Sequence, residues 1–556
     1  MNSVHPYKIK LIIVVLGALF FIPFLGAVHL FDWDEINFAE SAREMIVTGD
    51  YLTVQINFQP FWEKPPLFIW MQVLSMKIFG INEFAARFPN AICGIVTMLV
   101  LFNIGSKMRD NRFGITWVLA YAGSILPFFY FKSGIIDPWF NLFIFLGIYY
   151  LMLYSFPEYK NRMRSIILSA VFTGLAVLTK GPVGFLLVSL TGGIYLLTIR
   201  FRIKVSISEV ITYFIVLALV GGFWFILQLF NGNYNIMVDF IVYQARLFQT
   251  RDAGHGGFFG YHFVVLLIGV FPSSILAIKS FRGENLRNSK YKLMKKWMII
   301  LFWVVLILFS IVKTKIVHYS SLAYFPLAFL AAHYSIRSQV NIYKWNRWQT
   351  VLILLVAILI ALPVMFLPFV DRFKDVIIAK NWIKDDFAVA NLAAEANWTG
   401  FEFLPGLFFL VAVILIFVYV KKEQIFRRAL LLWSVTLLFT FSVLLIVVPK
   451  IEKYSQNALV EFFKSTQGKD AYVKNLYFKS YATYFYGKTL PPENKNFYDE
   501  NWLLTGDIDK DVYFVTKIHR AHLLDEYADI KKIGEKNGFV FFLREKPNKT
   551  NEEIIE

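Results

Sequence analysis

Residues 350–369 read TVLILLVAILIALPVMFLPF, a run without a charged side chain. About 20 mostly apolar residues are enough to cross the hydrocarbon core of a bilayer as a helix. Much of the chain repeats this pattern, because 57% of its 556 residues are hydrophobic, only 17% are charged, and its mean hydropathy is +0.55. Since a soluble domain carries about 25% charged residues, the sequence predicts a polytopic α-helical membrane protein.

The apolar runs predict about thirteen transmembrane helices by the length rule. The first extends from about Ile9 to Leu30. It is too long for a signal peptide and lacks an evident cleavage site, so we expect it to be retained. The other runs lie near residues 86–106, 113–131, 139–156, 166–179, 183–198, 209–229, 261–279, 297–312, 316–334, 350–369, 404–420 and 429–448.

The formal net charge of +17 is an indicator of orientation. In a soluble protein it would point to nucleic acid, but here the basic residues gather in alternate loops, and basic loops stay in the cytoplasm. This predicts a cytoplasmic N-terminus, acidic loops on the outer side and no nucleic-acid partner. The most basic loop, near 279–296, holds Lys279, Arg282, Arg287, Lys290, Lys292, Lys295 and Lys296.

After Val448 the composition becomes polar and mixed. We therefore predict two parts: a transmembrane part over residues 1–449, with juxtamembrane helices within 31–85, and a small soluble α/β domain over residues 450–556 on the periplasmic side. In the second part the expected strands are 471–478, 511–516 and 538–543, and the expected helices are 455–465 and 522–535.

The first outer loop, residues 31–85, is too long and too acidic for a plain connector, and long ordered loops are usually functional. Its sequence predicts a helix over Ala39–Thr48 and an interfacial helix over Leu67–Phe79, each ended by a glycine. For Glu35, Glu44 and Asp50 the competing interpretation is an ordinary solvated acidic loop.

Short motifs follow one another in this loop and beyond. They are Asp34-Glu35, Ala39-Glu40, Arg43-Glu44-Met45, Gly49-Asp50, Glu63-Lys64-Pro65-Pro66, Asp137-Pro138, the run Gly174 to Pro182, His255, and Lys315 with Tyr319. In these motifs the membrane part resembles the aminoarabinose-transferase-like branch of the protein mannosyltransferase superfamily (glycosyltransferase family 39, GT-C class). It departs from the family at Asn37, where an Arg is common, and at Ile316-Val317-His318, which replaces a Leu-Pro-Thr type segment. It also lacks the basic residue usual just after His255. Because of these departures, the sequence does not determine the sugar of the donor or the residues that bind its phosphate.

The resemblance implies a glycosyltransferase of the bacterial inner membrane. Its donor would be a sugar linked to polyprenyl phosphate, with the lipid tail between the helices. It would act as a monomer among membrane lipids, and its acceptor would be a hydroxyl or phosphate at the periplasmic face. Lipid A (with aminoarabinose as the sugar), another glycolipid and a secreted protein, as for a protein O-mannosyltransferase, are all open. The alternative from another class is a transporter or flippase for a lipid-linked sugar, whose key charges would lie near the bilayer midplane.

The motif residues have expected roles. Asp34 is the predicted general base, since a carboxylate near a low-dielectric boundary can work near neutral pH. Asp137 is the second carboxylate, with a helix N-cap as the alternative. The candidate phosphate partners, whose alternative is that of interfacial residues, are Lys64, Lys315, Tyr319, Arg246 and Arg251. The supporting residues are Glu35, Glu40 and Lys180.

Glu63 and His255 match positions that bind a divalent ion, zinc in the aminoarabinose branch. Carboxylate and imidazole suit zinc, but two ligands do not complete a site. Donor oxygens or water would have to supply the rest, and a structural pair without metal is the alternative.

Overall fold

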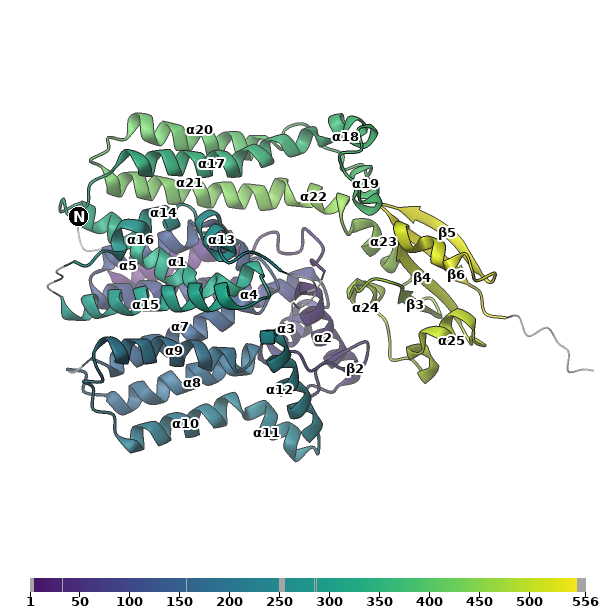
Figure 1. Ribbon diagram of the computed structural model, residues 1–556, viewed down its shortest axis with the longest axis horizontal. Coiled ribbons are helices and arrows are strands. Elements are labelled where there is room, and N and C mark those ends of the chain that lie inside the picture. Colours follow the sequence, from purple (N-terminus) through teal and green to yellow (C-terminus); the bar gives the residue numbers. More distant parts are fainter. Residues whose placement is uncertain are drawn as a thin grey trace, which may run out of the picture.

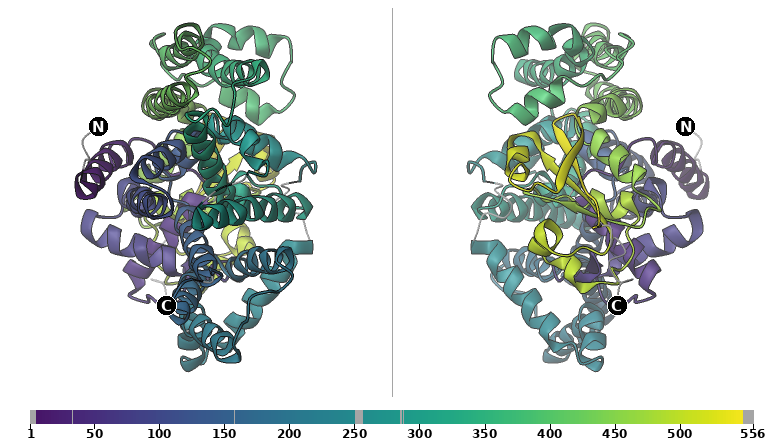
Figure 2. Two further views of the ribbon diagram at one scale, coloured as in Figure 1. Left: turned by 90° about the vertical axis from the view of Figure 1, so that its left-hand side faces the viewer. Right: turned by 90° about the vertical axis from the view of Figure 1, so that its right-hand side faces the viewer.

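The computed structural model describes residues 5–32, 34–156, 158–249, 256–284, 286 and 288–547. Long helices run side by side, and a four-stranded sheet lies beyond one end of them (Figure 1). We call this the sheet end. Seen from that end, the C-terminal part covers the middle of the helical body (Figure 2, right).

The first half of the chain supplies helices α1 to α12. Their bounds are α1 (Pro6–Phe21), α2 (Asp34–Thr48), α3 (Leu67–Phe79), α4 (Glu83–Met108), α5 (Asn111–Ala122), α6 (Ile125–Tyr130), α7 (Asp137–Tyr154), α8 (Arg162–Lys180), α9 (Val183–Thr198), α10 (Ile207–Gly221), α11 (Phe223–Phe230) and α12 (Tyr234–Gln249). Two short strands, β1 (Gln55–Ile56) and β2 (Gln59–Pro60), form a hairpin between α2 and α3.

The second half completes the helical body. Its helices are α13 (Tyr261–Gly269), α14 (Ser273–Ala277), α15 (Ser289–Ile311), the 3₁₀ helix η3 (Val317–Ala323), α16 (Tyr324–Ser338), α17 (Arg347–Phe366), α18 (Val370–Ala379), α19 (Asp386–Leu392), α20 (Leu404–Tyr419) and α21 (Ile425–Ile446). The described residues contain five helices long and apolar enough to cross a membrane, or seven if two bent helix pairs each count as one span. Several expected spans form shorter apolar helices, such as α9 and α20. The chain is thus a polytopic helical protein, and the count of thirteen spans stays a prediction.

Two element boundaries differ from the sequence-based expectation near the first outer loop. The first helix ends at Phe21, not near Leu30. Pro23, which lacks a backbone N–H, and Phe24, with φ of 62°, turn the chain there. Helix α2 begins at Asp34, before the expected Ala39. Acidic side chains in a first turn favour helix formation, because they face the positive end of the helix dipole.

The C-terminal part contains α22 (Val448–Tyr454), α23 (Asn457–Ser465), β3 (Ala471–Asn475), α24 (Ala482–Gly487), α25 (Glu500–Thr505), β4 (Asp511–Lys517), η6 (Ile518–Leu524), β5 (Ile530–Lys536) and β6 (Phe539–Arg544). The strand order is β3-β4-β6-β5, with only β3 and β4 parallel.

The expected helix over 522–535 is wrong, because β5 occupies its second half. Strands β5 and β6 pair with Lys536 opposite Phe539, around a turn in which Asn537 and Gly538 both have positive φ. Asn-Gly between apolar runs is a strong hairpin signal. This dipeptide should have predicted the strand.

One hydrophobic core joins the first outer loop to the C-terminal part. Buried side chains of α2, among them Ile36, Phe38 and Met45, belong to the same cluster as Leu459, Phe463, Phe485 and Phe541. This shared core, together with the contacts of α2 to α3, fixes where the first residues of α2 lie.

Candidate active site

Helix α2 is held against the bundle by the guanidinium of Arg87, on α4. Arg87 Nη2 lies 2.7 Å from Glu35 Oε2, and both side chains are buried. The carboxylate of Glu35 also accepts hydrogen bonds from the backbone N–H groups of Phe31 and Gly134. The remaining hydrogen bonds from Arg87 go to the carbonyl oxygens of Leu25, Val28 and His29, at 2.7 to 2.9 Å. Glu35 is therefore an anchor for the residue beside it, Asp34.

A second acidic cluster lies in the middle of α2. Arg43 donates two hydrogen bonds of 2.7 Å to the carboxylate of Glu40, and Glu44 accepts the backbone N–H groups of Asn57 and Phe58. Burial, together with the neighbouring carboxylate of Glu40, raises the pKa of Glu44 to about 9. Glu44 therefore holds the β1–β2 hairpin against α2, while Glu40 pairs with Arg43 within the helix.

The solvated-loop interpretation is wrong for two of its three residues. Glu35 is 3% exposed and Glu44 is fully buried. Asp50 lies in a turn, where it accepts the N–H groups of Leu52 and Thr53 at 2.9 and 3.0 Å. These hydrogen bonds lower the pKa of Asp50 despite its partial burial, which acts in the opposite direction.

Asp34 differs from the other carboxylates of α2 because its side chain is 49% exposed. It lies in the first turn of the helix, at the sheet end of the bundle. The ring nitrogen Nδ1 of His318, on η3, lies 3.7 Å from Asp34 Oδ2. Asp34 is thus accessible to a substrate while its position is fixed by the anchored helix.

Asp137 forms an ion pair with Lys180. Lys180 Nζ, at the end of α8, donates to Asp137 Oδ1 over 2.7 Å, and the two side chains are 13% and 4% exposed. Asp137 is the first residue of α7 and the N-cap position belongs to Ile136, so the capping alternative is wrong. Such a partly dehydrated pair interacts strongly, since little water screens it.

The Asp137–Lys180 pair lines a pocket of about 90 Å³ between α7, α9 and α15. Lys64, Asn141, Gln244 and Tyr319 complete its polar part. The Lys64 ammonium lies 5.3 Å from the ring centre of Tyr243, and that of Lys180 lies 5.6 Å from the ring centre of Tyr319. The apolar part is formed by Phe140, Val183, Leu187, Leu308, Phe309, Val312 and Leu322. Charged groups thus lie beside an apolar wall.

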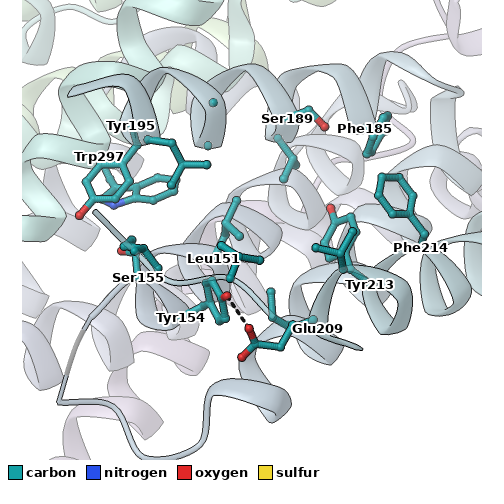
Figure 3. A pocket seen from close by; sticks show the side chains of 18 residues that line it. Leu151, Tyr154, Ser155, Phe185, Ser189, Tyr195, Glu209, Tyr213, Phe214 and Trp297 are labelled. Carbon is teal, nitrogen blue, oxygen red and sulfur yellow. Dashed lines mark hydrogen bonds between the residues drawn. The ribbon is translucent and has the colours of Figure 1, made fainter. Parts of the chain in front are cut away.

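A second cavity of about 310 Å³ lies along the same helix, α9, toward the other end of the bundle (Figure 3). Its lining is almost entirely apolar and aromatic, with Tyr195 and Trp297 stacked at 4.5 Å. The hydroxyl of Tyr154 donates to Glu209 over 2.8 Å at its edge. Both cavities are bordered by α7, α9 and α15.

Two of the expected phosphate partners, Lys315 and Arg246, do not line the pocket. The ammonium of Lys315 is buried and donates to three carbonyl oxygens at the end of α15, those of Phe309, Ser310 and Val312. It therefore completes the helix end, and its contact with a phosphate stays a prediction. Arg246 is exposed on α12, with its guanidinium over the ring of Tyr243. Arg251 lies outside the described residues.

The expected metal ligands are placed only in part. Glu63 is half-buried next to Lys64, and His255 lies outside the described residues. Within the described ranges, no three His, Cys, Asp or Glu side chains lie together as a metal would need. The metal prediction therefore stays with Glu63 and His255, and no chemical step below is assigned to it.

We predict that a bound divalent ion, if held by these residues, is lost when either is removed. Elemental analysis of the purified protein should then find close to one zinc per wild-type chain and well under half of that in Glu63→Ala and in His255→Ala. Glu44→Gln, altered in the same loop, is the control and should keep its metal. Equal metal content in all four proteins would remove Glu63 and His255 as ligands.

Sequence reasoning missed His318. No motif distinguishes it, and the sequence alone favours a packing or interface role for it, within a segment that departs from the family. One signal was available: His318 is the only residue between Lys315 and Tyr319 that can exchange a proton near neutral pH.

The chain is similar to known proteins in both sequence and fold. Residues 63–225 match the family described as dolichyl-phosphate-mannose-protein mannosyltransferase. The undecaprenyl phosphate-alpha-4-amino-4-deoxy-L-arabinose arabinosyl transferase of Photorhabdus laumondii is 27% identical over 369 residues, 62% of this chain and 64% of that protein. The protein of the same name from Serratia proteamaculans is 28% identical over 405 residues, 70% of each chain. The chain thus spans a little under two thirds of the first relative.

The fold extends further than the sequence similarity. The crystal structure of ArnT from Cupriavidus metallidurans bound to undecaprenyl phosphate superimposes with a TM-score of 0.73 and 16% sequence identity, over 97% of this chain and 98% of that one. At this identity the likeness establishes a common fold. The chain is thus similar in sequence to dolichyl-phosphate-mannose-protein mannosyltransferases over residues 63–225 and to aminoarabinose transferases over more than half of its length, and it has the fold of one such transferase.

Proposed function

We propose that this protein is a membrane glycosyltransferase that moves a sugar from a polyprenyl-phosphate donor to an acceptor at the periplasmic face of a bacterial inner membrane. The observation that carries the proposal is the pocket between α7, α9 and α15, where Lys64 and Lys180 lie beside a wall of Leu, Val and Phe side chains. A lipid phosphate has the same division between an anionic head and an apolar tail.

In this proposal the donor phosphate binds at Lys64, Lys180 and Tyr319. Charge-assisted hydrogen bonds to phosphate are strong where water is scarce. The first isoprene units pack on Val183 and Leu187, and the tail continues along α9 toward the larger cavity of Figure 3. With the N-terminus in the cytoplasm, the sheet end and the C-terminal domain lie on the periplasmic side.

The transfer step follows from the placement of the two carboxylates. Asp34 accepts the proton of the acceptor hydroxyl, and the acceptor oxygen bonds to the anomeric carbon of the sugar. The bond from this carbon to the phosphate oxygen breaks, and its electron pair stays on the polyprenyl phosphate. Asp137, held by Lys180, faces the positive charge that develops on the sugar, as the second carboxylate of a glycosidase does.

The names of the related proteins specify a donor but no acceptor. Two of them are named as transferases of 4-amino-4-deoxy-L-arabinose from undecaprenyl phosphate. We propose this sugar or a related one as the donor group and lipid A as the acceptor, with the protein acting as a monomer. A glycoprotein acceptor is the second candidate within the family.

Mass spectrometry of envelope lipids and glycoproteins, with and without the gene, tests the proposal. We expect a sugar mass increment on one envelope lipid that disappears on deletion and returns with the wild-type gene but not with Asp34→Asn. An unchanged set of lipids and glycoproteins would contradict it. A flippase would give no new product from a radiolabelled donor, only its movement across the membrane.

We also predict that Lys64→Met weakens binding of undecaprenyl phosphate by about 10- to 100-fold. The loss of one charge-assisted hydrogen bond of about 1.5–3 kcal/mol corresponds to this range. Quenching of tryptophan fluorescence by the lipid, titrated in detergent, measures the affinity. Lys77→Met is the matched control, because the Lys77 ammonium lies over the ring of Tyr51, away from the pocket. Equal affinities of the two variants would exclude Lys64 as the phosphate partner.

A further inference from the structure

The segment that carries His318 is fixed at both ends. Before it, the ammonium of Lys315 is bound to three carbonyl groups at the end of α15, and Thr314 forms a bridge with Gly256. After it, the hydroxyl of Ser321 donates to the carbonyl oxygen of His318, and Asn141 Nδ2 donates to that hydroxyl over 2.7 Å. The imidazole therefore has a defined place between the first turns of α2 and α7.

This place is the meeting point of the charged groups of the site. His318 is 13% exposed, with Nδ1 at 3.7 Å from Asp34 Oδ2. Four charged groups on four elements act on the ring: Asp34 on α2, Asp137 on α7, Lys180 on α8 and Lys64 before α3. His262 on α13 also lies close enough to act on it. The pocket of the proposed donor phosphate shares Asp137, Lys180 and Lys64 with this environment.

Two anionic and two cationic groups act on the ring, and burial has the largest effect on its pKa. Asp137 and Asp34 raise the pKa of His318, Lys180 and Lys64 lower it, and the largest effect, loss of contact with water, lowers it. The imidazole is therefore neutral at neutral pH and has one bare ring nitrogen. An unperturbed imidazole, with a pKa of about 6.5, is also a stronger base than an unperturbed carboxylate, with a pKa of about 4.

We propose that His318 is the proton acceptor for Asp34: its Nδ1, 3.7 Å from Asp34 Oδ2, takes the proton that this carboxylate receives from the acceptor hydroxyl. The ring acts as the tautomer with hydrogen on Nε2. The O–H bond on Asp34 breaks, an N–H bond forms at Nδ1, and the resulting imidazolium lies between Asp34 and Asp137. It later releases the proton to water, which restores both residues. His318 thus acts through Asp34, as a positioning residue, and the inference rests on the proposed transferase function.

Two substitutions test proton acceptance. His318→Asn keeps a polar amide near the position of Nδ1 but cannot take a proton. His318→Ala removes the ring altogether and can be supplied with added imidazole. The matched control is His522→Asn, an exposed histidine on η6 of the C-terminal part that is not among the groups acting on His318.

The assay uses purified full-length protein in liposomes, with undecaprenyl phosphate-linked aminoarabinose or mannose as the radiolabelled donor and extracted lipid A as the acceptor. We expect His318→Asn to lower kcat by about 100-fold, at the lower end of the range of general acid–base effects, with the donor KM within about threefold of the wild-type value. The wild-type rate should fall as pH drops through the lowered pKa of His318, and this fall should be absent in His318→Asn. Added imidazole should restore at least about tenfold to His318→Ala.

The double variant Asp34→Asn with His318→Asn should be no slower than Asp34→Asn alone, because residues that act as a unit are not additive. A kcat of His318→Asn within twofold of the wild type, an unchanged pH profile, or additive losses would overturn the inference. If His318→Asn does not fold, as judged by gel filtration, the test is the activity of His318→Ala with added imidazole. Recovery supports the inference, and no recovery overturns it. If the wild type turns over neither donor, the proposed function fails first, and the inference fails with it.

Discussion

Replacing Asp34 by Asn is expected to lower the rate of sugar transfer by about a thousandfold or more while leaving the protein folded. General base catalysis contributes about 10²–10⁴-fold in enzymes, and an amide cannot accept the acceptor proton. The side chain is 49% exposed and only 3.7 Å from His318, so its neutral isostere removes no buried hydrogen bond. The measurement is radiolabel transfer in liposomes at saturating donor.

The matched control is Asp50→Asn, in the turn that follows α2. Asp50 accepts two backbone N–H groups and lies away from the pocket, so this variant should lose some stability but keep its turnover number. Asp34→Asn should bind undecaprenyl phosphate like the wild type. Turnover by Asp34→Asn within tenfold of the wild type would remove its role as general base.

Arg87→Met is expected to cause the largest loss of stability of any single substitution considered for this protein. It leaves the Glu35 carboxylate buried without its cation and frees three carbonyl oxygens that Arg87 now satisfies. Breaking a buried ion pair by removing one partner costs about 3–5 kcal/mol. Thermal unfolding in detergent, followed by tryptophan fluorescence, should show a markedly lower midpoint.

The double variant Arg87→Met with Glu35→Gln provides the internal check. It removes the unpaired buried charge, so it should recover part of the loss, although the carbonyl groups stay unsatisfied. Arg109→Met, at the other end of α4 in a more exposed pair with Asp110, should change the midpoint little. A midpoint of Arg87→Met equal to that of the wild type would show that α2 is anchored by its hydrophobic contacts alone.

Much of the architecture follows from one-dimensional patterns in the sequence. Length and apolar composition predict helices that cross a bilayer, and Pro66 and Gly80 delimit α3 as expected. Strand β5 was not predicted, although the turn dipeptide Asn537-Gly538 indicates a β-hairpin at this point. For residues 522–535 the prediction relied on the helical spacing of apolar residues, and the local turn signal of Asn537-Gly538 was the better indicator.

The sequence predicted the part of the site in which the charge of a side chain is enough to indicate its role. Asp137, Lys64 and Lys180 lie together as the motifs indicated. The burial of Glu44 depends on backbone groups of the β1–β2 hairpin. Lys315 is drawn to carbonyl groups of its own preceding helix end. Both outcomes depend on how the chain turns after a helix, which residue types and their spacing do not specify.

The contacts between the first outer loop and the C-terminal domain also determine when the site can be completed during synthesis. Leu30 donates its backbone N–H to Tyr486, 456 residues later, and Tyr481 donates to Asp32, 449 residues later. At about 5–20 residues per second, a ribosome adds these partners some 20 to 90 s after the residues that need them. The segment before α2 therefore lacks these partners until the last domain emerges, whereas Arg87 of α4 can bind Glu35 much earlier. A chain that terminates early would keep its membrane helices and this ion pair but lack the hydrogen bonds that hold Leu30 and Asp32.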